Sequence, residues 1–393
     1  MNSLLKRQYT TIGVLSLAHM LNDLYSNYIP QMLLFLVVVD PDFTATKAAI
    51  LVSAFTISSS MMQPIFGFFL DRKGKRWLAY IGTLWMAIML SLTGIVHSYA
   101  ALVTLAGLAG MGTAAFHPQA STMVNILSGE RKALLLSGFV AFGNMGYALG
   151  PLILVPLFQA FGLSVTPFTV IPGVLVTVLL VFFTPNDRLI PPNELSITEV
   201  FRSIRLAARE LFAIISVIAI RSMAFTGLIT FLPLYFKSKN LSNISIGYMV
   251  TTMLFSGVFG GIMGGFISDN YGRKPLIVSS LIISTPLLFA FFLSEGTLRI
   301  VFMILAGAAL LSSISVTVVA AQEAIPNNKA FAAGLSMGFA GGVGGLAVIL
   351  VGRIADIWGM PTALAVVFML PFLSGLIALF MKSRPAAHGR IDA

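Results

Sequence analysis

Two long stretches of the sequence carry no charged residue, and they constrain the fold more than any other feature. Trp77–Gly129 and Ala133–Asn186 each run for more than 50 residues without Asp, Glu, Lys or Arg. One membrane-crossing helix needs about 20 apolar residues, so each stretch has room for two crossings and a short turn. Hydrophobic residues make up 57% of the chain and charged residues 10%, whereas soluble domains carry roughly 25% charged residues. The sequence therefore predicts a polytopic membrane protein.

Charge clusters and Pro, Gly or Asn turns divide the chain into twelve apolar segments. A transmembrane β-barrel would alternate polar and apolar residues with a period of two, and these segments do not. We therefore expect an all-α fold with twelve transmembrane helices. The predicted spans are residues 10–39, 46–70, 76–97, 99–127, 132–160, 164–184, 211–236, 243–268, 275–294, 298–325, 330–357 and 361–381.

The distribution of Lys and Arg predicts the orientation of these spans. With the N-terminus inside, 18 of the 24 Lys and Arg residues fall in cytoplasmic segments, five fall outside and Arg221 lies within a span. Because cytoplasmic loops are enriched in Lys and Arg, we expect both termini to be cytoplasmic and the protein to lie in the cell (inner or plasma) membrane. The net charge of +10 then reflects attraction to membrane lipids, so we expect no nucleic-acid partner.

The chain also contains an internal repeat with an offset of 198 residues, which pairs position 67 with position 265. The longest polar stretch, residues 185–210, separates the two copies. We predict an N-terminal six-helix half at residues 1–184, a cytoplasmic linker at 185–210, and a C-terminal six-helix half with a short tail at 211–393. The matched stretches are Gly67-Phe-Phe-Leu-Asp71-Arg72-Lys-Gly74-Lys-Arg76 and Gly265-Phe-Ile-Ser-Asp269-Asn-Tyr-Gly272-Arg273-Lys.

This doubled loop resembles the signature of the major facilitator superfamily. The resemblance implies two six-helix halves, alternating access, and a latch on the inner side that breaks and re-forms during transport. Gly67 and Gly265 would allow close helix approach, and Gly74 and Gly272 would permit a tight turn with positive φ. Asp71 would accept hydrogen bonds from a neighbouring helix N-terminus. The alternative is a signal for membrane orientation alone. The expected gating residues in this loop pair are Gly67, Asp71, Arg72, Gly74, Arg76, Asp269, Gly272 and Arg273.

The fifth predicted span is rich in glycine and ends in Gly150-Pro151. Gly143, Gly146 and Gly150 leave a groove for close helix packing, and Pro151 predicts a kink. The pattern resembles the antiporter motif of drug exporters, although the downstream glycine pair of that motif is absent. The resemblance implies export and adds Gly150 and Pro151 to the expected gating residues. A packing face of small residues is the alternative.

Ionisable residues inside a membrane are costly and mark candidate functional sites. His19 and Asp23 are four residues apart and share one face of the first helix, with Asp23 about midway across. A buried carboxylate must be paired or protonated, since an isolated buried anion costs several kcal/mol. We therefore expect Asp23 to load and unload a proton with His19. A structural His–Asp pair is the alternative.

Five further ionisable groups lie in or near the spans. His117, which titrates near neutral pH as histidines do, would relay protons, bind an anion, or satisfy the carbonyl freed by Pro118. Arg221 keeps its charge and needs an anionic partner, which is a substrate, Asp23 or Glu323. Glu323 is expected to act as a gate or cap. Arg353 and Asp356, three residues apart, are expected to form an ion pair.

The motifs of the first half resemble one branch of the superfamily, the fosmidomycin-resistance family. This resemblance implies proton-driven export of small, often anionic compounds such as a phosphonate antibiotic, but it does not transfer that substrate to this chain. The matching stretches are His19-Met-Leu-Asn22-Asp23, Gln63-Pro64-x-x-Gly67-x-x-x-Asp71-Arg72, Ala115-Phe116-His117-Pro118-x-Ala120, Gly143-Asn144-x-Gly146-x-Ala148-Leu149-Gly150-Pro151 and Phe231-Leu-Pro233-Leu-Tyr235.

We therefore predict a secondary active transporter, a monomeric proton-coupled antiporter that exports a small compound, with anions as one candidate class. The nearest alternative is a proton symporter or uniporter that imports an organic anion or a sugar-like solute. A non-transporting receptor or scaffold would not need Asp23, His117 and Arg221. No catalytic constellation, Walker loop or cysteine is present, so we expect no enzyme, cofactor or metal. The residues expected to bind substrate are Arg221, Asn22, Asn27, Gln119, Asn144 and Tyr235.

Overall fold

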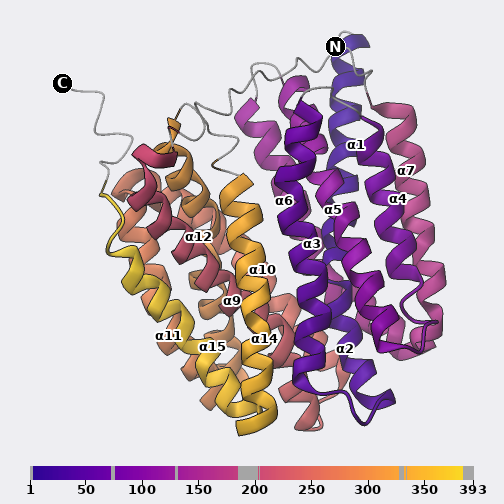
Figure 1. Ribbon diagram of the computed structural model, residues 1–393, viewed down its shortest axis with the longest axis vertical. Helices are drawn as coiled ribbons and strands as arrows, with labels where there is room; N and C mark the ends of the chain where they lie inside the picture. The colour runs from indigo at the N-terminus through magenta and orange to yellow at the C-terminus, as the bar shows by residue number, and fades with distance from the viewer. Residues whose placement is uncertain are drawn as a thin grey trace. The chain divides into compact units, whose positions relative to one another are not determined.

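The computed structural model describes residues 3–71, 76–128, 132–184, 202, 204–326, 332 and 334–383. Every regular element in these residues is a helix (Figure 1). The elements up to residue 183 are α1 (Ser3–Ser26), α2 (Tyr28–Val39), α3 (Ala45–Asp71), α4 (Trp77–Ser91), α5 (Tyr99–Leu127), α6 (Lys132–Phe161), the 3-10 helix η2 (Leu163–Thr169) and α7 (Val170–Phe183). The later elements are α9 (Ala208–Ser238), α10 (Asn243–Tyr271), α11 (Arg273–Leu293), α12 (Gly296–Ala324), the π-helical η5 (Leu335–Phe339), α14 (Ala340–Trp358) and α15 (Met360–Ala378).

The helices confirm the predicted all-α membrane fold. Ten of the described helices are long and apolar enough to cross a membrane, and α4 is a shorter apolar helix. The first predicted span is divided at Asn27, which lies between α1 and α2 with φ −93° and ψ 7°. Pro30 explains this break, because it has no N–H to donate to the carbonyl of Ser26 and its ring clashes with that carbonyl.

The chain forms two compact units. The first comprises Met1–Pro41 and Ile50–Glu194, and the second comprises Asp42–Ala49 and Leu195–Ala393. The second unit therefore includes the first turns of α3. The predicted linker at 185–210 falls largely outside the described residues, so the predicted limits of the two halves remain a prediction.

Close helix approach in the second unit does not involve the glycine that the sequence pattern indicated. A Cβ added at Gly264 of α10 would lie 2.5 Å from the carbonyl oxygen of Ser312 in α12, whereas one added at Gly265 would meet nothing within 4 Å. The expectation for Gly265 is therefore wrong. The two glycines are adjacent, so a step of about 100° around the helix decides which of them faces α12.

The predicted ion pair between Arg353 and Asp356 is also absent from the described contacts. The Asp356 carboxylate instead accepts hydrogen bonds from the backbone N–H groups of Ala45 at 2.8 Å and Thr46 at 3.0 Å. These donors belong to the first turn of α3, where backbone N–H groups lack helical partners and favour an anion. Asp356 thus caps α3, which a pattern of charges within α14 alone could not reveal.

Candidate functional site

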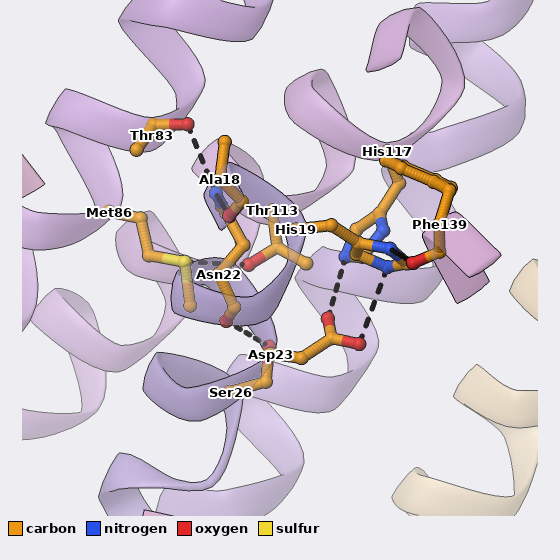
Figure 2. Close-up of polar contacts among 10 residues, drawn as sticks. All are labelled: Ala18, His19, Asn22, Asp23, Ser26, Thr83, Met86, Thr113, His117 and Phe139. Carbon is orange, nitrogen blue, oxygen red and sulfur yellow. Dashed lines mark hydrogen bonds and ion pairs between the residues drawn. The ribbon is translucent and has the colours of Figure 1, made fainter. Parts of the chain in front are cut away.

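Asp23 lies between two histidines in the first unit. Figure 2 shows its carboxylate facing both imidazole rings, with His19 Nε2 3.3 Å from Oδ2 and His117 Nε2 3.3 Å from Oδ1. His19 and Asp23 come from successive turns of α1, and His117 comes from α5. The side chains of His19, Asp23 and His117 are only 8%, 17% and 22% exposed. The predicted proton-coupling residues therefore meet in one buried cluster.

The orientation of His19 is fixed from its other side by α6. Its Nδ1 lies 2.8 Å from the backbone carbonyl oxygen of Phe139. Its ring also stacks on the ring of Phe139, with centroids 4.1 Å apart and an interplanar angle of 22°. A carbonyl oxygen can only accept a hydrogen bond, so Nδ1 carries the proton of this imidazole.

This assignment determines what the His19–Asp23 contact requires. With Nδ1 protonated, a neutral His19 presents an unprotonated Nε2 to Asp23, and an ionised carboxylate is also only an acceptor. Two acceptors at 3.3 Å repel unless a proton lies between them. The observed arrangement therefore needs a proton on either His19 Nε2 or Asp23 Oδ2. His117 needs no such extra proton, because its neutral Nε2–H form can donate to Oδ1.

Gly143 of α6 makes the space that the cluster occupies. A Cβ added at Gly143 would lie 2.4 Å from His19 Cε1, 2.5 Å from His19 Nε2 and 2.6 Å from Asp23 Oδ2. One turn later, a Cβ at Gly146 would lie 1.9 Å from the carbonyl oxygen of Met20. The glycine groove of the fifth span thus packs directly on α1, and any larger residue at position 143 would displace the His19–Asp23 pair.

We expect Gly143→Ala to uncouple transport from the pH gradient while the protein still folds. Misplacing reacting groups by about 1 Å can cost about a hundredfold in rate, and the added methyl group must move His19 or Asp23 by a comparable distance. The measurement is pH-driven transport in vesicles. Gly138→Ala is the matched control, because a Cβ there meets nothing within 4 Å. Equal loss in both variants would show that the effect is not specific to the cluster.

Two asparagines of the first span have different environments. Asn22 donates through Nδ2 to the Ala18 carbonyl at 2.9 Å and to Thr83 Oγ1 of α4 at 3.0 Å, while its buried Oδ1 has no partner among the described residues. Asn27 donates to the Tyr147 carbonyl at 2.9 Å and accepts from Gln31 at 3.0 Å. Asn27 therefore holds the α1–α2 junction against α6, and Asn22 retains an acceptor for a ligand or water.

The other expected substrate-binding residues are scattered. Gln119 of α5 is 4% exposed, and its Oε1 has no partner among the described residues. Asn144 is exposed on α6. Tyr235 of α9 packs its ring 5.0 Å from that of Phe292, between centroids. Of the expected substrate-binding residues in the first unit, Asn22 and Gln119 therefore present buried acceptor atoms that the described protein groups leave unused, as do Gln31 Oε1 and Thr177 Oγ1 outside that set.

Arg221 is a buried cation without a partner among the described residues. The residue is 5% exposed, and its Nε is fully buried with no hydrogen-bond partner. Glu323, one of the two carboxylates considered as its partner, instead approaches Arg273, with Arg273 Nε 3.4 Å from Oε1. Asp23, the other, contacts His19 and His117. Neither carboxylate forms an ion pair with Arg221 in the described contacts.

The second copy of the repeated loop forms a cluster where α10 meets α11. Gly272 adopts φ +96°, as expected for a tight turn that favours glycine. Arg273 pairs with both Asp269 and Glu323 and donates to Ser268 Oγ at 2.9 Å. In the first copy, Arg76 donates to the Thr184 carbonyl at 3.2 Å. Arg72 and Gly74 lie outside the described residues, as do the surroundings of Gly67 and the side chain of Asp71.

Gly150 and Pro151 lie within a continuous α6. A Cβ at Gly150 would lie 3.0 Å from Asn27 Cβ, so this glycine also packs against the first span. Pro151 is inside the helix, which extends from Lys132 to Phe161 without interruption.

Sequence reasoning missed Phe139, and it missed that Gly143 makes space for the His19–Asp23 pair. Phe139 acts through its backbone carbonyl, which no residue type encodes, and its offset of 120 positions from His19 has no sequence signature. The sequence indicates Gly143 as a packing residue, but its contact with the cluster depends on how α6 is rotated against α1.

The three ligand-type atoms of His19, Asp23 and His117 lie within 4.8 Å of one another. The contacts described above account for both carboxylate oxygens and both Nε2 atoms without a metal ion.

Comparisons with known proteins bear on the family and the fold of this chain. A family model described as Major Facilitator Superfamily matches residues 13–344 and again 214–392. The fosmidomycin resistance protein of Escherichia coli is 27% identical over 387 residues, which cover 96% of this chain and 93% of that protein. The MFS-type transporter YfnC of Bacillus subtilis is 29% identical over 392 residues, with 95% and 93% covered. The multidrug resistance protein MdtG of Citrobacter koseri is 26% identical over 238 residues, or 58% of each chain.

Two solved structures share the fold. The nucleoside transporter NupG superposes with a TM-score of 0.79 at 14% identity, covering 95% of this chain and all (100%) of that chain. A bacterial homologue of the human lysosomal transporter Spinster, in an inward-facing conformation, gives a TM-score of 0.71 at 16% identity, with 95% of both chains covered. At these identities the likeness establishes the architecture alone.

Proposed function

The chain belongs to the Major Facilitator Superfamily, and we propose that this multi-pass membrane transporter is a proton-coupled antiporter that exports a small compound by alternating access. Two relatives carry resistance in their names, the fosmidomycin resistance protein and the multidrug resistance protein MdtG. The former is similar over nearly the whole length of this chain. These names support export of a toxic compound as the direction of transport.

The observation that carries the proposal is the proton required between His19 and Asp23. His19 Nδ1 is committed to the Phe139 carbonyl, so Nε2 and the carboxylate can remain in contact only while a proton bridges them. When that proton leaves, the contact changes from attractive to repulsive. A buried contact that depends on one proton in this way can bias an equilibrium between two conformations of a transporter.

His117 gives the proton an exit from the pair. It contacts the second carboxylate oxygen, and its ring centroid lies 5.0 Å from that of His19. In the proposed cycle, the protonated cluster favours one state. Release of the proton through His117 separates His19 from Asp23 and favours the other state, in which substrate binds.

Arg221 supports an anionic compound as the substrate. An unpaired buried charge costs several kcal/mol, and a carboxylate, phosphate or phosphonate would relieve that cost through charge-assisted hydrogen bonds. In the first unit, Asn22 and Gln119 offer acceptor atoms for hydroxyl or amide donors on a substrate. We assign charge recognition to Arg221 and orientation of polar groups to the two amides.

The gating and orientation assignments remain part of the proposal. Both termini are placed in the cytoplasm by the Lys and Arg distribution, and the protein is taken to act as a monomer. The proposed inner latch comprises the two repeated loops. In the second loop, Arg273 pairs with Asp269 and Glu323. Gly150 and Pro151 on α6 complete the proposed gating set.

Overexpression is expected to lower the cellular accumulation of a toxic substrate, and a protonophore is expected to restore accumulation. The measurement is uptake of labelled compounds from a panel of phosphonates, organic acids, sugars and cationic drugs. An importer, the alternative direction, would raise accumulation on overexpression. If a protonophore lowered accumulation further in overexpressing cells, proton-driven export would be wrong.

A further inference from the structure

An arginine-rich, exposed surface lies at the start of α9. The side chains of Arg202, Arg205 and Arg209 are all exposed, and residues 204–206 are helical and lead through a turn at Ala207 into α9. Arg205 and Arg209 are four positions apart, and Arg202 precedes Arg205 by three. All three side chains are exposed within eight consecutive residues at the start of α9, so together they form one positively charged surface.

The protein does not neutralise this surface within its described part. None of the three arginines has a hydrogen bond or ion pair with any described residue. Glu210 is the one acidic residue between positions 202 and 212. Its side chain is only 7% exposed, and its Oε2 lies 3.8 Å from Nζ of Lys382. Lys382 is itself 74% exposed and adds a fourth cation near the same end of α9.

Apolar residues flank the arginines and fix their depth in the membrane. Leu206 is 81% exposed and Phe212 is 76% exposed, three positions before and after Arg209. Arg209 and Lys237 bracket the apolar part of the helix, and 28 residues at about 1.5 Å each place them about 42 Å apart. A bilayer measures about 40–45 Å across with its headgroups. Arg209 therefore reaches the phosphate layer, while Phe212 lies in the acyl chains.

We propose that Arg202, Arg205 and Arg209 form a binding site for the phosphate headgroup of an anionic phospholipid, whose acyl chains pack on Leu206 and Phe212. Arginine suits this ligand because its planar fork binds two phosphate oxygens at once. An uncharged surface would serve equally well for acyl chains alone. The arginines, which have no partner among the described residues, are therefore what select the headgroup.

The test measures lipid retention by native mass spectrometry of the full chain in detergent doped with equal amounts of phosphatidylglycerol and phosphatidylcholine. Each arginine near an anionic lipid surface contributes about a fivefold preference. We expect wild type to retain phosphatidylglycerol preferentially, and R205Q/R209Q to lose about twentyfold or more of that preference. K239Q/R353Q removes the same charge elsewhere, including the opposite end of α9, and should behave as wild type.

Three results would overturn the assignment: an unchanged preference in R205Q/R209Q, an equal loss in K239Q/R353Q, or equal protection of wild type by free inorganic phosphate in a melting assay. The last would show that the arginines recognise a soluble anion. The substituted side chains are exposed, and circular dichroism of each variant confirms that it folds. Because the readout is lipid retention, it does not depend on the direction or coupling of transport.

Discussion

Asp23→Asn is expected to abolish uphill, pH-driven transport while leaving the fold and substrate binding intact. The asparagine Nδ2 can donate to His19 Nε2, and its Oδ1 can accept from His117, so both contacts of the cluster survive without an exchangeable proton. The variant thus imitates the protonated state permanently. One proton driven by ~100 mV supplies roughly 2.3 kcal/mol, which sustains about a fiftyfold gradient. In the variant, the ratio of substrate concentrations across the membrane should fall to about one.

The measurement is substrate accumulation in proteoliposomes with an imposed pH gradient, followed by substrate binding across a pH series. Binding to Asp23→Asn should lose its pH dependence. Asp42→Asn is the matched control, because it makes the same chemical change at an exposed residue outside the helices. Uphill transport at the wild-type rate in Asp23→Asn would contradict the mechanism and would make His117 the next candidate for the coupling proton.

Most of the fold could be predicted because membrane helices are encoded locally. The long charge-free stretches and turn residues located the helices to within a few residues in most cases. The exception was Asn27, where a single predicted span contains a break caused by Pro30. Contacts between helices were harder to predict. Gly264 and Gly265 are identical residues that differ only in the helix face on which they lie. The Asp356 carboxylate accepts its hydrogen bonds from α3, which is far away in the sequence.

The candidate site was predictable in membership but not in chemistry. Ionisable residues in lipid are rare enough that His19, Asp23 and His117 stood out, and a spacing of four placed the first two on one helical face. The requirement for a bridging proton depends on the Phe139 carbonyl, which fixes the tautomer of His19. A backbone group that approaches from another helix leaves no trace in the residue pattern. The role of Gly143 was hidden for the same reason.

Arg221→Met is expected to abolish the stabilisation of the protein by anionic compounds and, at the same time, to stabilise the ligand-free protein. Methionine retains the length of the side chain without its charge. Because Arg221 is 5% exposed and lacks a described partner, its removal should raise the free energy of unfolding by about 1–4 kcal/mol. A compound present at a hundred times its Kd stabilises the folded state by about 2.7 kcal/mol, and this gain should vanish in the variant.

Thermal unfolding of purified protein measures both effects, with organic acids, phosphonates, sugars and cationic drugs as probes. Arg353→Met is the control, because Arg353 is exposed and its replacement should leave both the ligand-free stability and the response to anions unchanged. The opposite change in the ligand-free stability would contradict this prediction. A ligand-free Arg221→Met that unfolds more easily than wild type would mean that the guanidinium has a permanent partner within the protein. Substrate recognition would then have to rest on neutral groups such as Asn22 and Gln119, and an anion would no longer be the favoured substrate.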